Sequence, residues 1–455
     1  MKITKIIKGA IRLYKRFYLP ILLLVSILIA AGCNNSNGNE ENSGESNETS
    51  AEENNAEKTD KEENGASGHH TDLLTVEGTP FDESLFEVVD FESDPSPNDY
   101  YYQYASSGAL AMGGENHSIF FDYRTGERLS LETDVERLKG RAESSIVNTD
   151  SYTWPFLFGN YYYLQGNDVG TNKIIQVDLS TGEIEDLADA DGPSDMVKKD
   201  DILYIISADK LSALDTNTKE TIWETTGEVE LSTGYAELHA TDHALIYEDQ
   251  YGLTAFDIKD GTKLFEEEGV FRDVAVDGST FYALADEADA FSDSLYKVVE
   301  FDDQEGKKET IIEAPEVEEP YEIGEIKLDL VDDLLYITVE NGILTYDINS
   351  HEQLWSVSVG DLKDRSETGD DYNYWFSAGI TGNHVYAFTE KSNVANDRDN
   401  FLTVIDSKTG EVKNQYSFGK AIGAGPIIDE ENGNVMVYLQ YFNDEGAQGF
   451  ILPIE

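Results

Sequence analysis

The side chains best suited to chemistry are few: one cysteine, two adjacent histidines and one aspartate-rich stretch. Cys33 is the only cysteine of the 455 residues, which excludes a disulfide within the chain. His69 and His70 could suggest metal binding, but they end a polar linker and are interpreted as a solvated pair. The stretch DLADADGPSD fails the calcium-loop pattern because Leu187 takes the first ligand place and Lys198 the last. We therefore predict no metal site.

A set of seven aspartates recurs in similar stretches of sequence. In LSALDTNTKETIW, residues 211–223, an alternating apolar run ends on the aspartate, a turn-like TNTK follows, and a tryptophan comes eight residues after the aspartate. The copies lie about 40 to 60 residues apart, close to the period of propeller blades. Five copies carry glycine four residues after the aspartate, and Lys219 and His351 replace it in the other two. The repeat residues are Asp122, Asp178, Asp215, Trp223, Asp257, Asp302, Asp347, Trp355 and Asp406.

The repeat has the composition of two strands joined by a tight turn. Alternating apolar residues before the aspartate predict a half-buried strand. The carboxylate can accept backbone amides and glycine supplies a positive φ, so both belong to the turn. The aromatic residue on the next strand is predicted to pack against the neighbouring unit. These aspartates are therefore interpreted as structural.

The repeated unit predicts the fold class. Apolar strands such as DDILYIIS and DHALIYED precede the copies, so each unit is an antiparallel sheet of about four strands. Such sheets at this period, without helical stretches between them, indicate an all-β protein, a β-propeller; two packed sandwiches are the weaker alternative. Eight blades are favoured, with seven as the fallback. The last unit has three strands, and residues 84–93 are predicted to supply the fourth and close the ring.

The N-terminal region predicts export and a lipid anchor. Residues 1–32 read as a lipoprotein signal peptide, because a basic segment precedes an apolar run and small residues come directly before Cys33. These small residues resemble the bacterial lipobox, which implies acylation of Cys33; an ordinary signal peptide or an uncleaved anchor is the alternative. Residues 33–70 are polar and are predicted to form a disordered acidic tether. Residues 71–455 would form the propeller.

The chain is strongly acidic, with 91 Asp and Glu against 32 Lys and Arg and a formal net charge of −59. Most of this charge falls within the predicted propeller. A body this negative repels nucleic acid and anionic surfaces, which excludes nucleic acid as a partner and limits membrane contact to the lipid anchor. Two explanations stay open: a solvated surface suited to salt, or binding of cations or cationic ligands.

Asp-x-x-Thr-Gly followed by tryptophan resembles the PQQ-like repeat of β-propeller proteins over nearly all of residues 72–455. That family includes quinoprotein dehydrogenases and also non-enzymatic lipoproteins, notably the propeller subunit of the Gram-negative outer-membrane assembly machine. The dehydrogenases typically have two adjacent cysteines over the cofactor, and here Cys33 stands alone. The resemblance therefore implies the non-enzymatic branch, with no catalytic residue and no cofactor.

Long loops are predicted on one face of the propeller, where the links between blades and the links from second to third strands lie. Some of these segments bring aromatic residues next to an inner strand. Aromatic side chains there could line the mouth of the channel and stack on a sugar, a peptide or a cationic group; alternatively, they plug the channel or pack between blades. The candidate rim residues are Tyr101, Tyr152, Trp154, Tyr372, Tyr374 and Trp375.

Together these observations predict a monomeric, lipid-anchored propeller on the outer side of the cell membrane that catalyses no reaction. Its long-loop face would bind a protein or a cell-envelope polymer, because long loops on a rigid scaffold are common binding elements. A quinone-dependent or hydrolytic enzyme and a structural spacer without a specific ligand are the alternatives.

Overall fold

The computed structural model describes part of the chain, all of it within the compact unit Asn64–Glu455. The described residues are 68–77, 85–91, 102–106, 109–113, 118–122, 124–126, 156–168, 171–179, 181–190, 194–207, 210–226, 236–249, 251–286, 296–313, 326–339, 341–359, 372–393, 398–419, 422–430, 432–440 and 447–454. The predicted signal peptide, Cys33 and most of the predicted tether lie outside them. Among the described residues, no helix is long and apolar enough to cross a membrane.

The described strands fall into eight antiparallel sheets, numbered here in chain order. Sheet 1 contains β3 (Tyr102–Ser106), β4 (Ala109–Gly113) and β5 (Ser118–Asp122). Sheet 2 contains β6 (Phe156–Phe158), β7 (Tyr161–Asp168), β8 (Thr171–Asp178) and β9 (Ile184–Ala190). Sheet 3 contains β10 (Ser194–Lys199), β11 (Ile202–Ser207), β12 (Lys210–Asp215) and β13 (Thr221–Thr226). Sheet 4 contains β14 (Ala236–Ala240), β15 (Ala244–Asp249), β16 (Gly252–Asp257) and β17 (Lys263–Glu268).

The second half of the chain continues the same pattern. Sheet 5 contains β18 (Val270–Asp277), β19 (Thr280–Asp286), β20 (Tyr296–Asp302) and β21 (Gly306–Glu313). Sheet 6 contains β22 (Lys327–Val331), β23 (Leu334–Val339), β24 (Gly342–Asp347) and β25 (Gln353–Ser358), with β1 (His69–Asp72) added in parallel to β25. Sheet 7 contains β26 (Tyr372–Ile380), β27 (His384–Asn393), β28 (Arg398–Asp406) and β29 (Val412–Gly419). Sheet 8 contains β30 (Ile422–Asp429), β31 (Asn434–Gln440), β32 (Ala447–Pro453) and β2 (Glu87–Phe91).

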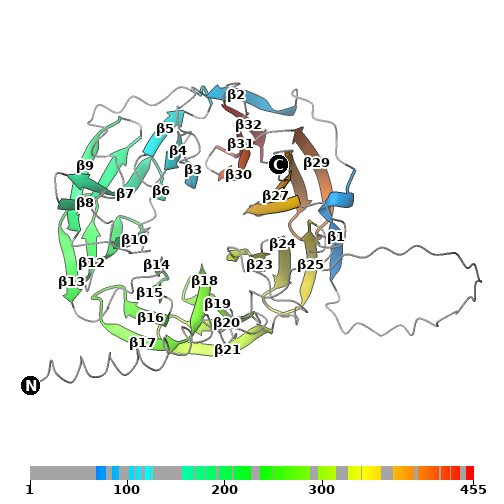
Figure 1. The fold of residues 1–455 in the computed structure, drawn as a ribbon. Coiled ribbons are helices and arrows are strands. Elements are labelled where there is room, and N and C mark those ends of the chain that lie inside the picture. Colours follow the sequence, from blue (N-terminus) through cyan, green and yellow to red (C-terminus); the bar gives the residue numbers. More distant parts are fainter. Residues whose placement is uncertain are drawn as a thin grey trace, which may run out of the picture. The chain divides into compact units, whose positions relative to one another are not determined.

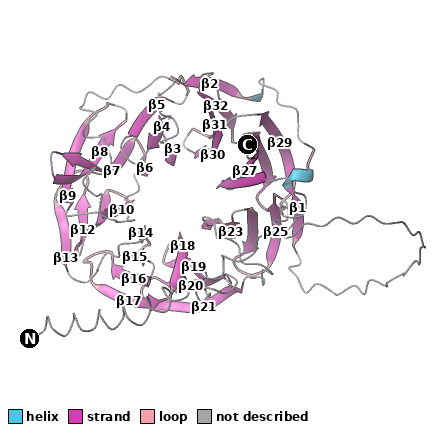
Figure 2. Ribbon diagram, viewed as in Figure 1, coloured by secondary structure: helices cyan, strands magenta, loops and turns pink. Residues whose placement is uncertain are grey.

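Within this unit the sheets follow one another around a common centre, with β10, β14 and β18 innermost and β13, β17 and β21 outermost (Figure 1). The innermost strands contact each other between sheets 1 and 2, 3 and 4, 4 and 5, 5 and 6, and 7 and 8, and β3 of sheet 1 contacts β30 of sheet 8. Strands and the turns between them make up nearly all of the described chain (Figure 2). The predicted all-β propeller is confirmed. The count of eight blades for the whole chain stays a prediction, because residues 127–155 are not described.

The hydrophobic core lies between neighbouring sheets. One cluster joins Tyr204 and Leu211 of sheet 3 to Leu245 and Phe256 of sheet 4, and similar clusters join other consecutive sheets. The sequence accounts for this arrangement: the second strands, such as ILYIIS in β11, are buried along almost their whole length, as strands covered on both faces must be. The outermost strands, such as TIWETT in β13, alternate between half-buried and exposed residues.

Sheet 8 is built from both ends of the described chain. Strand β2 pairs antiparallel with β32, from Glu87 opposite Ile451 to Phe91 opposite Ala447. Phe86 packs edge-on against Tyr416 of sheet 7, with ring centroids 5.0 Å apart. The prediction that residues 84–93 supply the missing outer strand is therefore confirmed.

The boundary predicted between tether and propeller is too late in the sequence. His69 and His70 were assigned to a disordered tether that ends at residue 70, but both lie in β1, which is paired with β25. The 3-10 turn η1 (Leu73–Thr75) follows, and the buried Leu73 joins the core between sheets 6 and 7. The physical reason is the exposed edge of β25: its free backbone groups accept any extended segment, including a polar one.

Candidate functional site

Six of the seven repeat aspartates close the turns between the third and fourth strands of their sheets, and Asp122 closes the turn that follows β5, the last described strand of sheet 1. At Asp215, Oδ1 accepts the N–H groups of Asn217 and Thr218 at 2.9 and 2.8 Å. The carbonyl oxygen of the same aspartate accepts the N–H of Lys219 at 2.8 Å. Equivalent carboxylate bonds to turn amides occur at Asp122, Asp178, Asp257, Asp302, Asp347 and Asp406.

Through these hydrogen bonds, backbone amides of the turns occupy the carboxylates. The amide of Thr218 holds the pKa of Asp215 below its usual range, because it stabilises the charged form. The fifth turn residue adopts a positive φ in every copy, at glycine in five of them and at Lys219 (φ 60°) and His351 (φ 61°) in the other two. The turns thus have one geometry whichever residue occupies that place.

The aromatic residues of the repeat lie across the junctions between sheets. Trp223 of sheet 3 donates its Nε1–H to the carbonyl of Ile258 in sheet 4 at 3.1 Å, and its ring covers Gly261 so closely that a Cβ there would lie 2.6 Å from it. Trp355 of sheet 6 repeats the contact at sheet 7: it donates to the carbonyl of Ser407 at 2.9 Å and covers Gly410. Each tryptophan therefore joins its own sheet to the turn of the next sheet.

The junction between sheets 2 and 3 is built differently. Glu185 stands opposite Gln176 in sheet 2, in the place that Trp223 holds opposite Ala213 in sheet 3. It pairs with Lys219 of the next turn, with Nζ and Oε1 2.7 Å apart. An ion pair thus replaces the aromatic–glycine contact. The pattern was present in the sequence, because the tryptophan and the turn glycine are missing from consecutive copies.

A second group of acidic residues lies toward the centre, on β10, β14, β15 and β18; we refer to it as the inner acid cluster. Its members are Asp195, Glu237, His239, Glu248 and Asp273. Glu237 and Glu248 stand directly opposite each other on β14 and β15, and Glu248 is fully buried. His239 Nε2 lies 3.7 Å from Glu237 and 3.8 Å from Glu248. The imidazolium offsets the repulsion between two carboxylates that face each other in one ladder.

Two aspartates of the cluster connect neighbouring sheets. Asp273 accepts the N–H of Leu328, on β22 of sheet 6, at 2.6 Å, and it also accepts the N–H of Val274 at 2.8 Å. Asp195 of sheet 3 interacts in the same way with the amide of Leu238 in sheet 4. Asp273 lies at a β-bulge between Phe271 and Val274 in the pairing of β18 with β19, whereas Asp195 makes its contact from a regular ladder.

Burial sets the protonation of this cluster. It raises the pKa of Asp195 to about 7 and that of Asp273 to about 7, because the charged forms are poorly solvated there. Burial also raises the pKa of Glu248. Burial alone would lower the pKa of His239, but Glu248, Glu237 and Asp273 outweigh it and raise that pKa to about 9. The cluster can therefore gain and lose protons near neutral pH.

The described residues contain no group of three His, Cys, Asp or Glu side chains placed to hold a metal ion. Of the stretch DLADADGPSD, residues 186–190 lie in β9, where side chains alternate between the two faces of a sheet, residues 194 and 195 begin β10, and residues 191–193 lie outside the described residues. The inner acid cluster supplies titratable groups and cross-sheet hydrogen bonds. The described side chains of this cluster can exchange protons, and they form hydrogen bonds that join neighbouring sheets.

The predicted rim residues divide into two groups. Tyr101, Tyr152 and Trp154 lie outside the described residues. Tyr372, Tyr374 and Trp375 were predicted to lie in a loop just ahead of an inner strand, but their backbone belongs to β26 itself, where Tyr372 stands opposite Asn393. The strand is longer than expected because β27 extends to ten residues and gives β26 a partner along its full length. The structure describes none of these six side chains.

No curated protein matches the chain. Among solved structures, the Neurospora crassa Pan2 WD40 domain is similar with 11% identity and a TM-score of 0.44, over 74% of this chain and 100% of that one. A crystal structure of a eukaryotic initiation factor is similar with 12% identity and a TM-score of 0.42, over 80% of this chain and 92% of the other.

One family comparison covers half of the chain. The sequence model of a family described as "Outer membrane protein assembly factor BamB" matches residues 189–416. The matched region runs from β9 to β29 and contains five of the seven turn aspartates as well as Trp223 and Trp355. The aspartates form the turns and the two tryptophans the sheet-to-sheet contacts described above, and the predicted PQQ-like repeat is thereby confirmed. The protein belongs to the BamB family of β-propeller proteins.

Proposed function

We propose that the protein is a lipid-anchored propeller outside the cytoplasm that binds a protein or a cell-envelope polymer and catalyses no reaction. Family membership and the propeller fold support a scaffold or binding module. The turn aspartates, the residues that resembled a catalytic signature, accept hydrogen bonds from their own turns and are engaged in structure. The proposal places binding at the face with the long links.

A difference between the two ends of the sheets carries this proposal. At one end, the links from first to second and from third to fourth strands are short turns, such as residues 200–201 and 216–220. Because neighbouring strands are antiparallel, all remaining links start and finish at the opposite end. That end holds long ones, among them residues 314–325 and 360–371, because the described strands on either side of each segment end and begin there. Long links on a rigid scaffold are typical binding elements.

The first experiment tests the binding face. Full-length protein in detergent is used to capture partners from a cell-envelope extract, and the double variant Trp154→Ala, Trp375→Ala is compared with the unmodified protein. Ile222→Ala is the matched control, because this side chain is 51% exposed on the outermost strand β13. We expect the double variant to lose the specific partner and the control to keep it. Equal capture by all three proteins would exclude these two tryptophans as the site.

A second experiment tests the anchor and the absence of quinone chemistry. Mass spectrometry of the mature protein should show a diacylglycerol on Cys33, and Cys33→Ser should release the protein from the membrane fraction, because acyl chains supply the membrane affinity. Addition of quinone and calcium should leave the melting temperature unchanged. A mature N-terminus elsewhere would contradict the anchor, and saturable stabilisation by quinone would favour an enzyme.

A further inference from the structure

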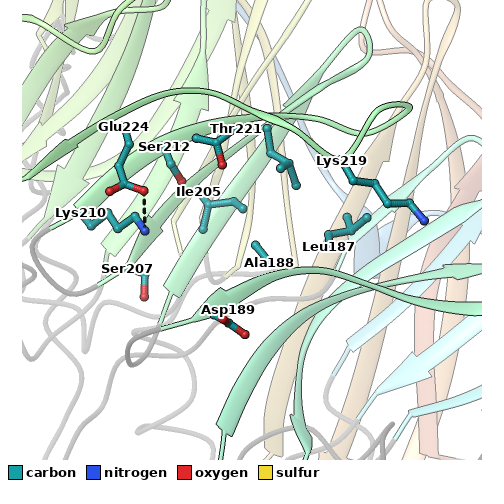
Figure 3. A pocket seen from close by; sticks show the side chains of 11 residues that line it. Leu187, Ala188, Asp189, Ile205, Ser207, Lys210, Ser212, Lys219, Thr221 and Glu224 are labelled. Atoms are coloured by element: carbon teal, nitrogen blue, oxygen red, sulfur yellow. Dashed lines mark ion pairs between the residues drawn. The ribbon is translucent and has the colours of Figure 1, made fainter.

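A polar pocket lies at the junction where the aromatic contact is missing, between β9 of sheet 2 and β11, β12 and β13 of sheet 3 (Figure 3). Its volume is about 220 Å³. At the junctions with tryptophan, an indole ring lies across the turn of the next sheet. The smaller ion pair of Glu185 with Lys219 leaves more space between the sheets. The pocket thus lies at one of the junctions that depart from the aromatic–glycine contact.

The two sheets line the pocket with different chemistry. On β12, Lys210, Ser212 and Leu214 share one face because they are two residues apart. Glu224, opposite Ser212 on β13, pairs with Lys210, with Nζ and Oε2 2.6 Å apart. From sheet 2, β9 contributes Asp189. Figure 3 shows Lys210, Glu224 and Ser207 together toward one end of the pocket and Lys219 toward the other.

Ser207 marks the pocket as a place that can accept a ligand. Its side chain is only 5% exposed, and its Oγ has no hydrogen-bond partner among the described residues. Buried hydroxyl groups are nearly always hydrogen-bonded, because an unpaired one loses its solvation without compensation. The Cα of Ser207 stands opposite that of Lys210 in the β11–β12 ladder. A polar group placed here would meet both a hydroxyl and an ammonium.

The charged side chains that line the pocket indicate which charges a ligand should carry. Three ion pairs border the pocket, Lys210 with Glu224, Lys219 with Glu185 and Lys173 with Asp189, so these groups together carry no net formal charge in a protein of net charge −59. A simple anion would meet carboxylates beside the lysines, and a simple cation would meet ammonium groups beside the acids. A molecule that carries both charges can satisfy both sets at once, since opposite charges within a few ångströms favour each other.

We propose that this pocket binds a small zwitterionic α-amino acid. The ligand carboxylate interacts with Lys210 and with the hydroxyl of Ser207, and the ligand ammonium interacts with Glu224 and Asp189. The apolar side chains of Ile205 and Leu187 adjoin these groups and suit a short aliphatic side chain. The 220 Å³ of the pocket far exceeds the roughly 10–15 Å³ that one water needs, so there is room for a ligand the size of alanine or valine. This inference does not rest on the proposed function, although Ser207 and Lys210 flank the link between the second and third strands of sheet 3, at the long-link end of the sheets.

Calorimetric titration of the full-length protein in detergent tests the ligand class. L-alanine and L-valine are compared with acetate, methylamine and glycerol, which carry only the carboxylate, only the ammonium, or only hydroxyl groups. We expect saturable binding of the amino acids and at least about tenfold weaker binding of the other three, because each lacks one set of contacts. Comparable binding of acetate would indicate an anion site, comparable binding of methylamine a cation site, and comparable binding of glycerol a polyol site. Each of these results, like the absence of binding, would overturn the proposal.

Variants assign the binding to the pocket. Ser207→Ala and Lys210→Met should each weaken L-alanine binding by about tenfold or more, since each removes a hydrogen bond to a charged group. Lys210→Arg should restore part of the affinity, which separates a lost charge from a lost fold. Lys263→Met is the matched control, because Lys263 forms a similar exposed pair with Glu266 on β17, outside the pocket. Unchanged affinity in both Ser207→Ala and Lys210→Met would exclude the pocket as the site.

Discussion

Two junctions of the propeller solve the same packing problem in opposite ways. Between sheets 6 and 7, the fully buried Trp355 covers Gly410 and donates a hydrogen bond across the junction. Between sheets 2 and 3, an exposed ion pair of Glu185 and Lys219 occupies the corresponding place. Apolar burial stabilises a fold far more than an exposed ion pair does. The comparison indicates that the aromatic junction stabilises the propeller, whereas the ionic junction leaves room for the pocket proposed to bind a ligand.

The largest expected effect is at the aromatic junction. Trp355→Ala should lower the free energy of unfolding by about 3–5 kcal/mol, because it leaves a cavity and removes the hydrogen bond to Ser407. Denaturant unfolding of the full-length protein measures the loss. Trp355→Phe, which keeps most of the ring, should lose less. A loss below about 1 kcal/mol for the alanine variant would contradict the role of this contact.

A smaller effect is expected from the glycine beneath the ring. Gly410→Ala should cost about 1–3 kcal/mol, because its Cβ would lie 2.6 Å from Trp355 and its φ is +72°. Gly433→Ala is the matched control: it has a φ of +65° but no atom within 4 Å of the new Cβ. The difference between the two variants in thermal unfolding isolates the clash from the backbone strain. Equal losses would show that the indole yields to the methyl group.

The inner acid cluster connects sheets without aromatic residues, and its contribution should depend on pH. The pKa values of Asp195 and Asp273 are raised to about 7, so the folded protein binds more protons than the unfolded chain between about pH 4 and pH 7. Stability contributed by these carboxyls is present below that window and is lost as the pH rises through it. His239, with its pKa raised to about 9, acts in the same direction at higher pH.

Unfolding measured across this range should therefore show stability falling as the pH rises. Asp273→Asn should make the fall shallower, because the amide does not titrate. Asp347→Asn is the control: the pKa of this turn aspartate is lowered by the amide of Ser350, so its titration falls at a more acidic pH. An unchanged slope in Asp273→Asn would show that this carboxyl is not a source of the pH dependence.

The smallest effect is expected at the ionic junction. Glu185→Gln should change the free energy of unfolding by less than about 1 kcal/mol, because the pair with Lys219 is partly exposed and screened by salt. Thermal unfolding at low and high salt measures both the change and its screening. A loss as large as that of Trp355→Ala would remove the contrast between the two junctions.

Much of the fold could be predicted because it follows from local sequence. Aspartate and glycine at fixed spacing specify a turn wherever they occur, and period-two alternation specifies the flanking strands. The role of residues 84–93 followed from a count of strands in the last unit. These inferences needed no knowledge of which residues meet in space.

The rest depends on contacts between distant parts of the chain. The inner acid cluster joins residues of four strands, and the β-bulge at Asp273 left no recognisable mark in the sequence. The placement of His69 and His70 was missed because a polar segment gained a partner, the free edge of β25. The sequence shows that the copy around Asp178 lacks the aromatic residue and that the next copy has Lys219 in place of the turn glycine. Only a comparison of these two consecutive copies would have connected both changes with a pocket.

The closure of sheet 8 has a consequence for the order of folding. Strand β2 begins at Glu87, while its partner β32 ends at Pro453, and Gln448 bonds Asp90 across 358 residues of chain. Contacts this far apart in sequence form slowly, because a long loop must close before they contribute. Sheets 2 to 5 need only neighbouring residues and can assemble while synthesis continues. The ring itself can close only once β32 is available to pair with β2, so a chain without β32 exposes two unpaired sheet edges.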